Sequence, residues 1–230
     1  MDEATMYIVA KRHMERVANR LDDEQLRQTC PSCPAWSNQD VIAHHIHFLG
    51  AVIDNDVPSE VFRAITDTDE AARSAAGDAR DEWTEAGVDA RRGRALDELI
   101  DEWNQLIATM PPEVHPTVDV VVHLGDVLEA LGERRGFDTA LVEDSLRKYY
   151  DMTLADRIAV TGDAVTLRCV DTGVRIGAAS GQPEIAGTAY ELLRTIAGRR
   201  TRVEADDALD WGGAPESTRR LFSAYGWPEH

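Results

Sequence analysis

The segment from Val118 to Gly132 constrains the fold of this chain most, because it places charged side chains on an otherwise apolar helix. Asp119, His123 and Asp126 fall at positions i, i+4 and i+7, so a helix carries all three on one stripe. Burying two carboxyl groups and an imidazole costs free energy unless they are paired, protonated or bound to a cation. The segment therefore indicates either a buried polar site or a stripe that faces solvent.

A second segment, residues 33–50, contains a helix start followed by three histidines. Ser37 and Asp40 have the spacing of a capping box, with aspartate in place of the usual glutamate. Prolines at positions 31 and 34 exclude a helix immediately upstream. We therefore predict a helix that begins near Asn38 and ends near Asp54.

The three histidines of this helix do not share one face. His44 and His47 lie on the same side, whereas His45 is rotated by about 100° from His44. A single histidine on an apolar helix face is more often a hydrogen-bonded core residue than a metal ligand. Together with the Asp119 stripe, however, His44 would supply ligands for an open metal site with three protein ligands. His45 then stands apart, and we expect His45→Ala to change metal retention little.

Helical periodicity predicts four long amphipathic helices, at residues 3–21, 38–54, 96–110 and 116–132. Residues 57–93 are polar and only patchily periodic, so we expect short helices and mobile connections there, with Trp83 as an anchor. Such a segment serves either as a lid over a site or as a plain surface connection. Two of the four long helices carry inward polar side chains, which is how a helix bundle builds a metal site.

After a further predicted helix at residues 137–155, the pattern changes to period two. Alternation at residues 157–160 and 165–169 predicts a hairpin, and residues 174–178 predict a third strand. Residues 185–196 then predict a helix that ends at Gly198. We therefore predict a helical domain at residues 1–153, followed by a small α+β domain at residues 154–230.

The charge balance narrows the range of partners. The chain has 42 acidic and 24 basic residues, a formal net charge of −18, which would repel phosphate backbones and anionic lipid surfaces. We expect a small-molecule partner, and neither nucleic acid nor a membrane. The first residues lack a secretory signal pattern and no stretch approaches 18 consecutive apolar residues, so we expect a soluble, cytoplasmic protein.

Three cysteines are too few for a disulfide framework. The pair Cys30-x-x-Cys33 lacks the second pair of a structural zinc site, and it lacks the βαβ setting typical of a redox motif. We expect ordinary packing for these two cysteines at the entrance to the helix, and a redox role is the alternative left open.

Two motifs carry a family resemblance. The sequence from Cys33 to His44, Cys-Pro-Ala-Trp-Ser-Asn-Gln-Asp-Val-Ile-Ala-His, resembles the signature of the maleylpyruvate isomerase family, whose metal-binding bundle is related to the DinB-like domain. Asp119-x-x-x-His123-x-x-Asp126 is similar to the family's second motif, in which a glutamate precedes the histidine. The C-terminal residues Gly187-x-x-x-x-Leu192-Leu193 and Gly198-Arg199 are similar to its sterol-carrier-like C-terminal domain. The resemblance implies a DinB-like four-helix bundle followed by a small α+β domain.

By this resemblance the metal ligands are His44, Asp119 and His123, and the ion is a divalent metal such as zinc. Because aspartate is one methylene shorter than the family's glutamate, either the helix lies closer to the metal, a water intervenes, or metal binding is weak. The cosubstrate implied is a low-molecular-weight thiol, mycothiol in the family's namesake. Its thiolate would add to an activated double bond, allow rotation and leave again, whereas a transferase would stop at the adduct.

An anionic substrate would need arginine to bind it in so acidic a protein. Arg199 is our candidate catalytic residue, with Arg200 as the alternate, and solvation at the surface is the other role open to each. Two other functions remain open. One is a metal-dependent hydrolase with Asp119 or Asp126 as the base, and the other is a non-catalytic module that binds a small molecule.

Overall fold

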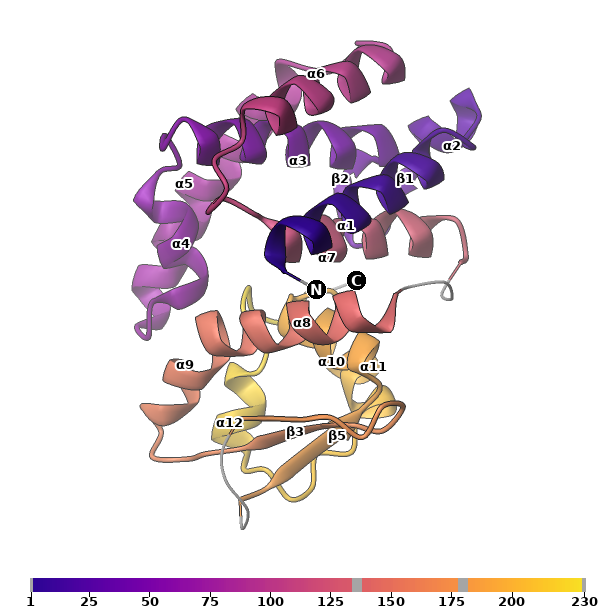
Figure 1. The fold of residues 1–230 in the computed structure, drawn as a ribbon. Coiled ribbons are helices and arrows are strands. Elements are labelled where there is room, and N and C mark those ends of the chain that lie inside the picture. The colour runs from indigo at the N-terminus through magenta and orange to yellow at the C-terminus, as the bar shows by residue number, and fades with distance from the viewer. Residues whose placement is uncertain (1, 134–137, 178–181, 229–230) are drawn as a thin grey trace. The chain divides into compact units, whose positions relative to one another are not determined.

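The computed structural model describes residues 2–133, 138–177 and 182–228, which belong to two compact units (Figure 1). The first unit comprises residues 1–59 and 78–136, and the second comprises residues 60–77 and 137–230. Helix α5, Glu70–Asp89, is divided between them. In the part of the chain that the structure describes, no helix combines the length and apolar character that crossing a membrane requires.

Four long helices make up most of the first unit, as the periodicity predicts. They are α1 (Glu3–Ala18), α3 (Asn38–Ile53), α6 (Leu96–Thr109) and α7 (Thr117–Ala130). Helix α7 packs against α1 and α3, and α3 also packs against α6 (Figure 1). A short helix α2 (Asp23–Arg27) and a hairpin of β1 (Thr29–Cys30) and β2 (Cys33–Ser37) join α1 to α3. The predicted four-helix bundle is confirmed.

Helix α7 is buried along almost its whole length. Every residue from Val120 to Leu128 is buried, because α1, α3 and β1 all pack against this helix. His123 is 5% exposed and Asp126 is fully buried. The polar stripe therefore does not face solvent, and the core must accommodate its charges.

The connection between α3 and α6 is more helical than the sequence pattern suggests. It contains α4 (Ser59–Thr66) and the 20-residue α5, so the expectation of only short helices is wrong. Six of the 20 residues of α5 are alanine, which favours a helix without needing an apolar stripe. Trp83 packs its ring against His47 with centroids 4.3 Å apart, and so anchors α5 to α3 within the first unit.

The second unit is a small α+β structure. It contains α8 (Thr139–Tyr149), a π-helical turn η1 (Tyr150–Leu154), α9 (Ala155–Ala159), β3 (Thr166–Cys169), β4 (Arg175–Gly177), β5 (Glu184–Gly187), α10 (Ala189–Ile196), α11 (Arg202–Ala208) and α12 (Glu216–Leu221). The strand order is β4-β3-β5, with β3 antiparallel to β4 and parallel to β5. Helix α10 packs against α8 and against strands β3 and β5. The predicted α+β character of the C-terminal part is confirmed.

Three details of this unit differ from the predictions. Residues 157–160 are not a strand, because they continue the α8–η1–α9 helical run, and the hairpin instead pairs β3 with β4. The predicted helix at residues 185–196 begins only at Ala189, because residues 184–187 form β5 and Thr188 caps α10 by accepting a hydrogen bond from the Glu191 amide. Helix α8 lies in the second unit because it packs on α10, whereas we placed the domain boundary after residue 153. Phe137 and Ala178, at the ends of two predicted elements, lie outside the described residues.

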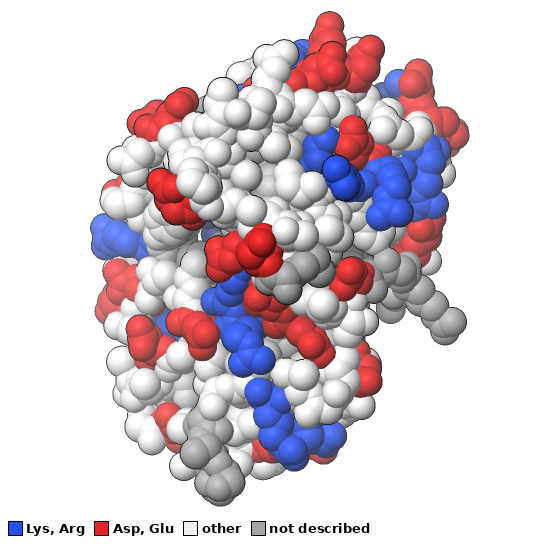
Figure 2. Space-filling view, in the orientation of Figure 1, with Lys and Arg blue, Asp and Glu red and all other residues white. Residues whose placement is uncertain are grey.

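Arginines are interspersed with the acidic side chains on the surface (Figure 2). In the first unit, Arg91 pairs with Glu102 of α6 at 2.6 Å, and Arg92 pairs with Glu85 of α5 at 2.6 Å. Arg92 also lies 3.5 Å from Asp40 in the first turn of α3. These ion pairs connect the end of α5 to the helices on either side of it.

Two glycines of α5 make a matched test of this packing. A Cβ at Gly87 would overlap the His47 ring, whereas a Cβ at Gly77 would meet nothing within 4 Å. We expect Gly87→Ala to lower the free energy of unfolding by about 1–3 kcal/mol, because the ring must move. Gly77→Ala should raise it by about 0.5–1 kcal/mol through helix propensity. Urea unfolding of both variants checks this, and equal effects would contradict the close contact.

Candidate metal centre

The start of α3 orients its histidines. The Ser37 hydroxyl accepts a hydrogen bond from the Asp40 amide at 3.1 Å, and the Asp40 carboxylate accepts one from the Ser37 amide at 2.9 Å. This is the capping box that the sequence predicts, and the helix begins at Asn38 as expected. Because the first residue of the helix is fixed, so is the direction in which each histidine of α3 points.

His44 of α3 and two residues of α7 converge. The Nε2 atom of His44 lies 3.9 Å from Oδ1 of Asp119, and Nε2 of His123 lies 3.5 Å from the same oxygen. The two imidazole rings are 4.8 Å apart at 72°. Ligand atoms of these three residues all lie within 4.8 Å of one another. Ligands around a tetrahedral zinc ion lie about 3.3 Å apart, so the group needs only a small contraction to hold one.

The protonation of His123 also favours a cation in this position. Its Nδ1–H donates to Oδ2 of Asp126 at 2.9 Å, which leaves a lone pair on Nε2. That lone pair faces the carboxylate oxygen of Asp119, also an acceptor, at 3.5 Å. Two acceptors facing each other repel unless a cation or a proton lies between them. The residues therefore fit a divalent metal with His44, Asp119 and His123 as ligands, and Asp126 orients His123.

His45 contacts the site, and the expectation that it stands apart is wrong. Its Nδ1 lies 2.5 Å from Oδ2 of Asp119, so the carboxylate meets His44 and His123 through one oxygen and His45 through the other. His44 and His45 point about 100° apart, but both reach Asp119 because the carboxylate lies between their two directions. The helical periodicity gives the direction of each histidine. It does not show that one carboxylate, that of Asp119, is wide enough to contact both His44 and His45.

A buried chain of hydrogen bonds continues from His45. The carboxylate of Asp119 accepts the His45 Nδ1–H, so Nε2 accepts from the Tyr7 hydroxyl at 3.0 Å. The Tyr7 oxygen in turn accepts from the indole N–H of Trp103 at 2.8 Å. The chain takes one residue from each long helix: Trp103 from α6, Tyr7 from α1, His45 from α3 and Asp119 from α7. Sequence reasoning missed Tyr7 and Trp103, which look like ordinary apolar positions of their helices.

Burial and neighbouring charges set the protonation states in the site. Burial opposes ionisation of Asp119, but the imidazole of His123 and hydrogen bonds from His44 and His45 outweigh it and hold its pKa well below the usual value. Burial lowers the pKa of His123, although Asp119 and Asp126 oppose this. Burial raises the pKa of Tyr7. The carboxylate is therefore charged, which is the form that binds a metal.

Aromatic side chains surround the histidine pair. The centroid of the Trp36 ring lies 4.8 Å from that of the His44 ring, and the centroid of the Phe48 ring, roughly parallel to His44, lies 6.5 Å from it. The Trp36 indole N–H donates to Glu85 at 2.8 Å, which fixes the plane of the ring. The Asp119 side chain nevertheless keeps 21% of its surface exposed. The site is thus partly apolar, and Asp119 is its partly exposed member.

His47 does not contact the candidate ligands. It packs on Trp83, and its buried Nε2 has no hydrogen-bond partner among the described residues. Burial, followed by the charge of Arg91, lowers its pKa to about 4. His47 is therefore a neutral packing residue.

The arginine candidates lie in the second unit. Arg199 follows the end of α10, donates to the Ala197 carbonyl oxygen at 2.9 Å and lies over the Tyr225 ring at 5.9 Å. Arg200 is buried and pairs with Glu191 at 2.7 Å. The carboxylate of Glu191 balances the charge of Arg200.

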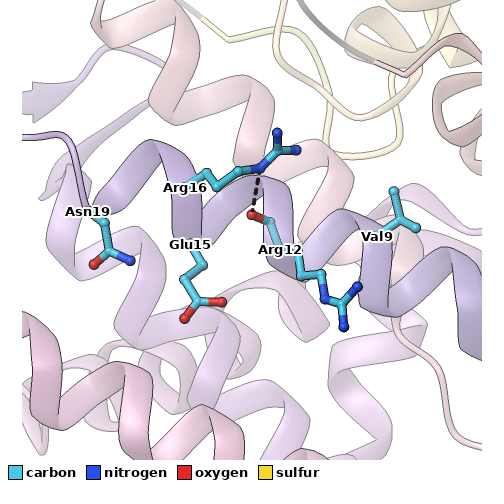
Figure 3. Close-up of a pocket in the computed structure, with 5 residues that line it drawn as sticks. All are labelled: Val9, Arg12, Glu15, Arg16 and Asn19. Atoms are coloured by element: carbon cyan, nitrogen blue, oxygen red, sulfur yellow. Dashed lines mark hydrogen bonds between the residues drawn. The ribbon is translucent and has the colours of Figure 1, made fainter.

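An open hollow of about 340 Å³ lies elsewhere on the first unit. It is lined by Val9, Arg12, Glu15 and Arg16 of α1 and by Asn19, which caps the C-terminal end of that helix (Figure 3). Arg16 donates through Nε to the Arg12 carbonyl oxygen at 3.2 Å and so folds back along the helix (Figure 3). None of the candidate ligands lines this hollow.

This chain matches a known protein family and is similar to solved structures. Residues 9–127, more than half of the chain, match the family described as mycothiol maleylpyruvate isomerase N-terminal domain. A solved structure of a histidine-to-alanine mutant of the mycothiol-dependent maleylpyruvate isomerase is similar, with a TM-score of 0.50 and 14% identity over 93% of this chain and 94% of that one. The structure of the non-mutant isomerase gives a TM-score of 0.49 at the same identity and coverage. A search of curated proteins gave no match.

The hydrogen bond between His45 and Asp119 predicts that a substitution of His45 changes the affinity for zinc. We expect His45→Phe to weaken zinc binding by about 10–100-fold, because Asp119 loses the partner that orients it. His47→Phe, on the same helix, should leave zinc affinity unchanged. Competition with a chromogenic chelator measures both affinities, and wild-type affinity in His45→Phe would show that the contact does not support the site.

Proposed function

This chain belongs to the mycothiol maleylpyruvate isomerase N-terminal domain family, and on that premise we propose that it is a metal-dependent enzyme that uses a low-molecular-weight thiol. Its reaction is the isomerisation of a small, electrophilic anion, or the transfer of the thiol to it. The observation that carries this proposal is the convergence of His44, Asp119 and His123 around one point, where the Asp119 side chain is 21% exposed. That arrangement has three protein ligands and leaves a position for sulfur.

The three ligands that we propose are the ones that the family motifs indicate. Asp119 lies 3.5 and 3.9 Å from the two histidine nitrogens, which supports direct binding in spite of its short side chain and makes an intervening water unnecessary. A divalent metal ion, zinc in our proposal, supplies the positive charge that lowers the pKa of a thiol from about 8.5. A thiolate is then available at neutral pH.

The chain's own residues hold this site in shape. Asp126 accepts the Nδ1–H of His123 and keeps the Nε2 lone pair directed at the centre. His45 holds the second oxygen of Asp119, so the carboxylate cannot rotate freely. Trp36, fixed by Glu85, covers His44 and limits the access of water. Each of these contacts keeps a ligand in the geometry that binding requires.

Thiol chemistry explains how such a site isomerises a double bond. Addition of the thiolate converts the double bond into a single bond, about which the adduct rotates. Elimination then re-forms the double bond in the other geometry and releases the thiol unchanged. A transferase retains the adduct as its product. In either reaction we propose that Arg199 binds the anionic group of the substrate.

Two other functions give different results. A metal-dependent hydrolase, with Asp119 or Asp126 as base, would turn over without any thiol. A non-catalytic binding module would retain no metal after purification and gain none from added zinc. Both alternatives share the fold but not the thiol requirement, so the two measurements below separate all three functions.

Metal content tests the ligand set. We expect His44→Ala and His123→Ala each to abolish zinc retention, because either change leaves only two protein ligands. His47→Ala should retain zinc at the wild-type level and serves as the matched control on α3. Metal analysis of the purified, folded proteins gives the result, and full retention in either ligand variant would exclude our assignment.

Thiol dependence tests the chemistry. With zinc bound, we expect turnover of a cis-configured, activated unsaturated diacid only when a low-molecular-weight thiol is present, and none with the His123→Ala variant. Proton NMR distinguishes the cis and trans products from a thioether adduct. Hydrolysis products formed without thiol would favour the hydrolase instead.

A further inference from the structure

Cys30 and Cys33 face each other across the hairpin of β1 and β2. They are directly paired in the antiparallel register, with Pro31 and Ser32 as the intervening turn. Opposed residues of antiparallel strands have Cα atoms about 4.5–5.5 Å apart, which lies inside the range of about 4.4–6.8 Å that a disulfide requires. Both residues are thiols in this structure, and their sulfur atoms lie within 4.8 Å of each other. Side-chain rotation alone therefore brings the two sulfurs within bonding reach.

The two thiols differ in accessibility. Cys30 is fully buried, whereas Cys33 is partly exposed. A reagent from solvent therefore meets Cys33 first, and Cys30 lies behind it as a second thiol. This is the arrangement of an attacking and a resolving cysteine. The sequence favoured packing over a redox role for this pair, because the turn lacks a βαβ setting.

The hairpin is also connected to the candidate metal centre within the first unit. The Cys33 Sγ–H donates to Oδ2 of Asp126 at 3.6 Å, and the same oxygen accepts the Nδ1–H of His123 at 2.9 Å. His123 presents its other nitrogen to the centre. Two hydrogen bonds thus link the Cys33 thiol to a candidate metal ligand.

We propose that Cys30 and Cys33 form a redox-active dithiol, which a low-molecular-weight disulfide oxidises. The oxidation state of this dithiol alters how tightly His123 binds the metal. Cys33 attacks the disulfide, forms a mixed disulfide and releases one thiol. Cys30 then attacks the Cys33 sulfur, closes the Cys30–Cys33 bond and releases the second thiol. Two protein thiols are oxidised, their two protons go to the released thiols, and one small disulfide is reduced.

Oxidation removes the proton through which Cys33 hydrogen-bonds Asp126. The oxygen that also accepts from His123 then has one donor fewer, so its hydrogen bond to the His123 Nδ1–H strengthens. A stronger bond at Nδ1 makes Nε2 a better metal ligand. The oxidised protein should therefore hold zinc more tightly. This part of the inference rests on the proposed function, whereas the dithiol chemistry does not.

Mass spectrometry of the full chain tests the dithiol. Cys30, Cys33 and Asp126 are also close enough to hold a metal ion together, so the protein is first treated with a chelator. After exposure to oxidised glutathione, wild type should lose the mass of two hydrogens. Cys30→Ser should instead keep one glutathionyl group on Cys33, because the resolving thiol is gone. Stable glutathionylation of wild type, or no reaction, would overturn the proposal.

Cys169 gives the matched control. It is buried in β3, where burial raises its pKa to about 11, so it should not react. Cys169→Ser should therefore form the disulfide as wild type does. Formation that depends on Cys169 would overturn the assignment to the hairpin.

Zinc affinity tests the link to His123. Chelator competition should show tighter binding, by up to about tenfold, in oxidised than in reduced wild type. Cys33→Ser treated identically should show no difference, because its hydroxyl can still donate to Asp126 and cannot be oxidised. Equal affinities in the two states of wild type would overturn the link. Absence of zinc binding in both states would count against the proposed function, while the disulfide result on chelator-treated protein would stand independently.

Discussion

The buried hydrogen bonds of Asp119 are the interaction on which the first unit depends. Helix α7 is covered on several sides, so its carboxylates and its histidine lie where unpaired charges are costly. One oxygen of Asp119 faces two imidazoles and the other accepts from His45, which continues to Tyr7 and Trp103. Because this chain of contacts takes a residue from each long helix, it relates the rotation of all four helices to one another. A bundle held by apolar packing alone would tolerate small rotations that this network does not.

The same network shows how a metal site and a folded core share residues. Asp119 compensates the burial of two histidines, and those histidines lower the pKa of Asp119. His123 is in turn aimed by Asp126, which also accepts the Cys33 thiol hydrogen. The proposed ligands are thus oriented by residues that are not metal ligands themselves, such as Asp126 and His45. The hairpin before α3 is part of this support, although its two strands are short.

Sequence patterns predicted the helices of the bundle, because capping and 3.6-residue periodicity act locally. The grouping of His44 with Asp119 and His123 was implied by the family motifs, since periodicity does not say which helices meet. The sequence patterns assigned His45 to another face. Periodicity gives the direction of a side chain, but it does not show that the two oxygens of Asp119 reach residues on both faces. In the second unit, residues 157–160 alternate like a strand, yet Arg157 donates to the Ser223 carbonyl oxygen at 2.7 Å and belongs to a helix. Similarly, residues 184–187 became β5 because β3 offered a partner, which no local pattern reveals.

The π-helical turn between α8 and α9 has a consequence for the end of the chain. Such a turn holds one residue more than an α-helical turn, so it advances the angular position of everything that follows by about 100°. Arg157, three residues beyond it, is thereby directed at the carbonyl oxygens of Leu221 and Ser223, close to the end of α12. Without the additional residue, the same guanidinium would point elsewhere and these carbonyls would lose their cation. One inserted position in the middle of the sequence therefore anchors a segment more than sixty residues away.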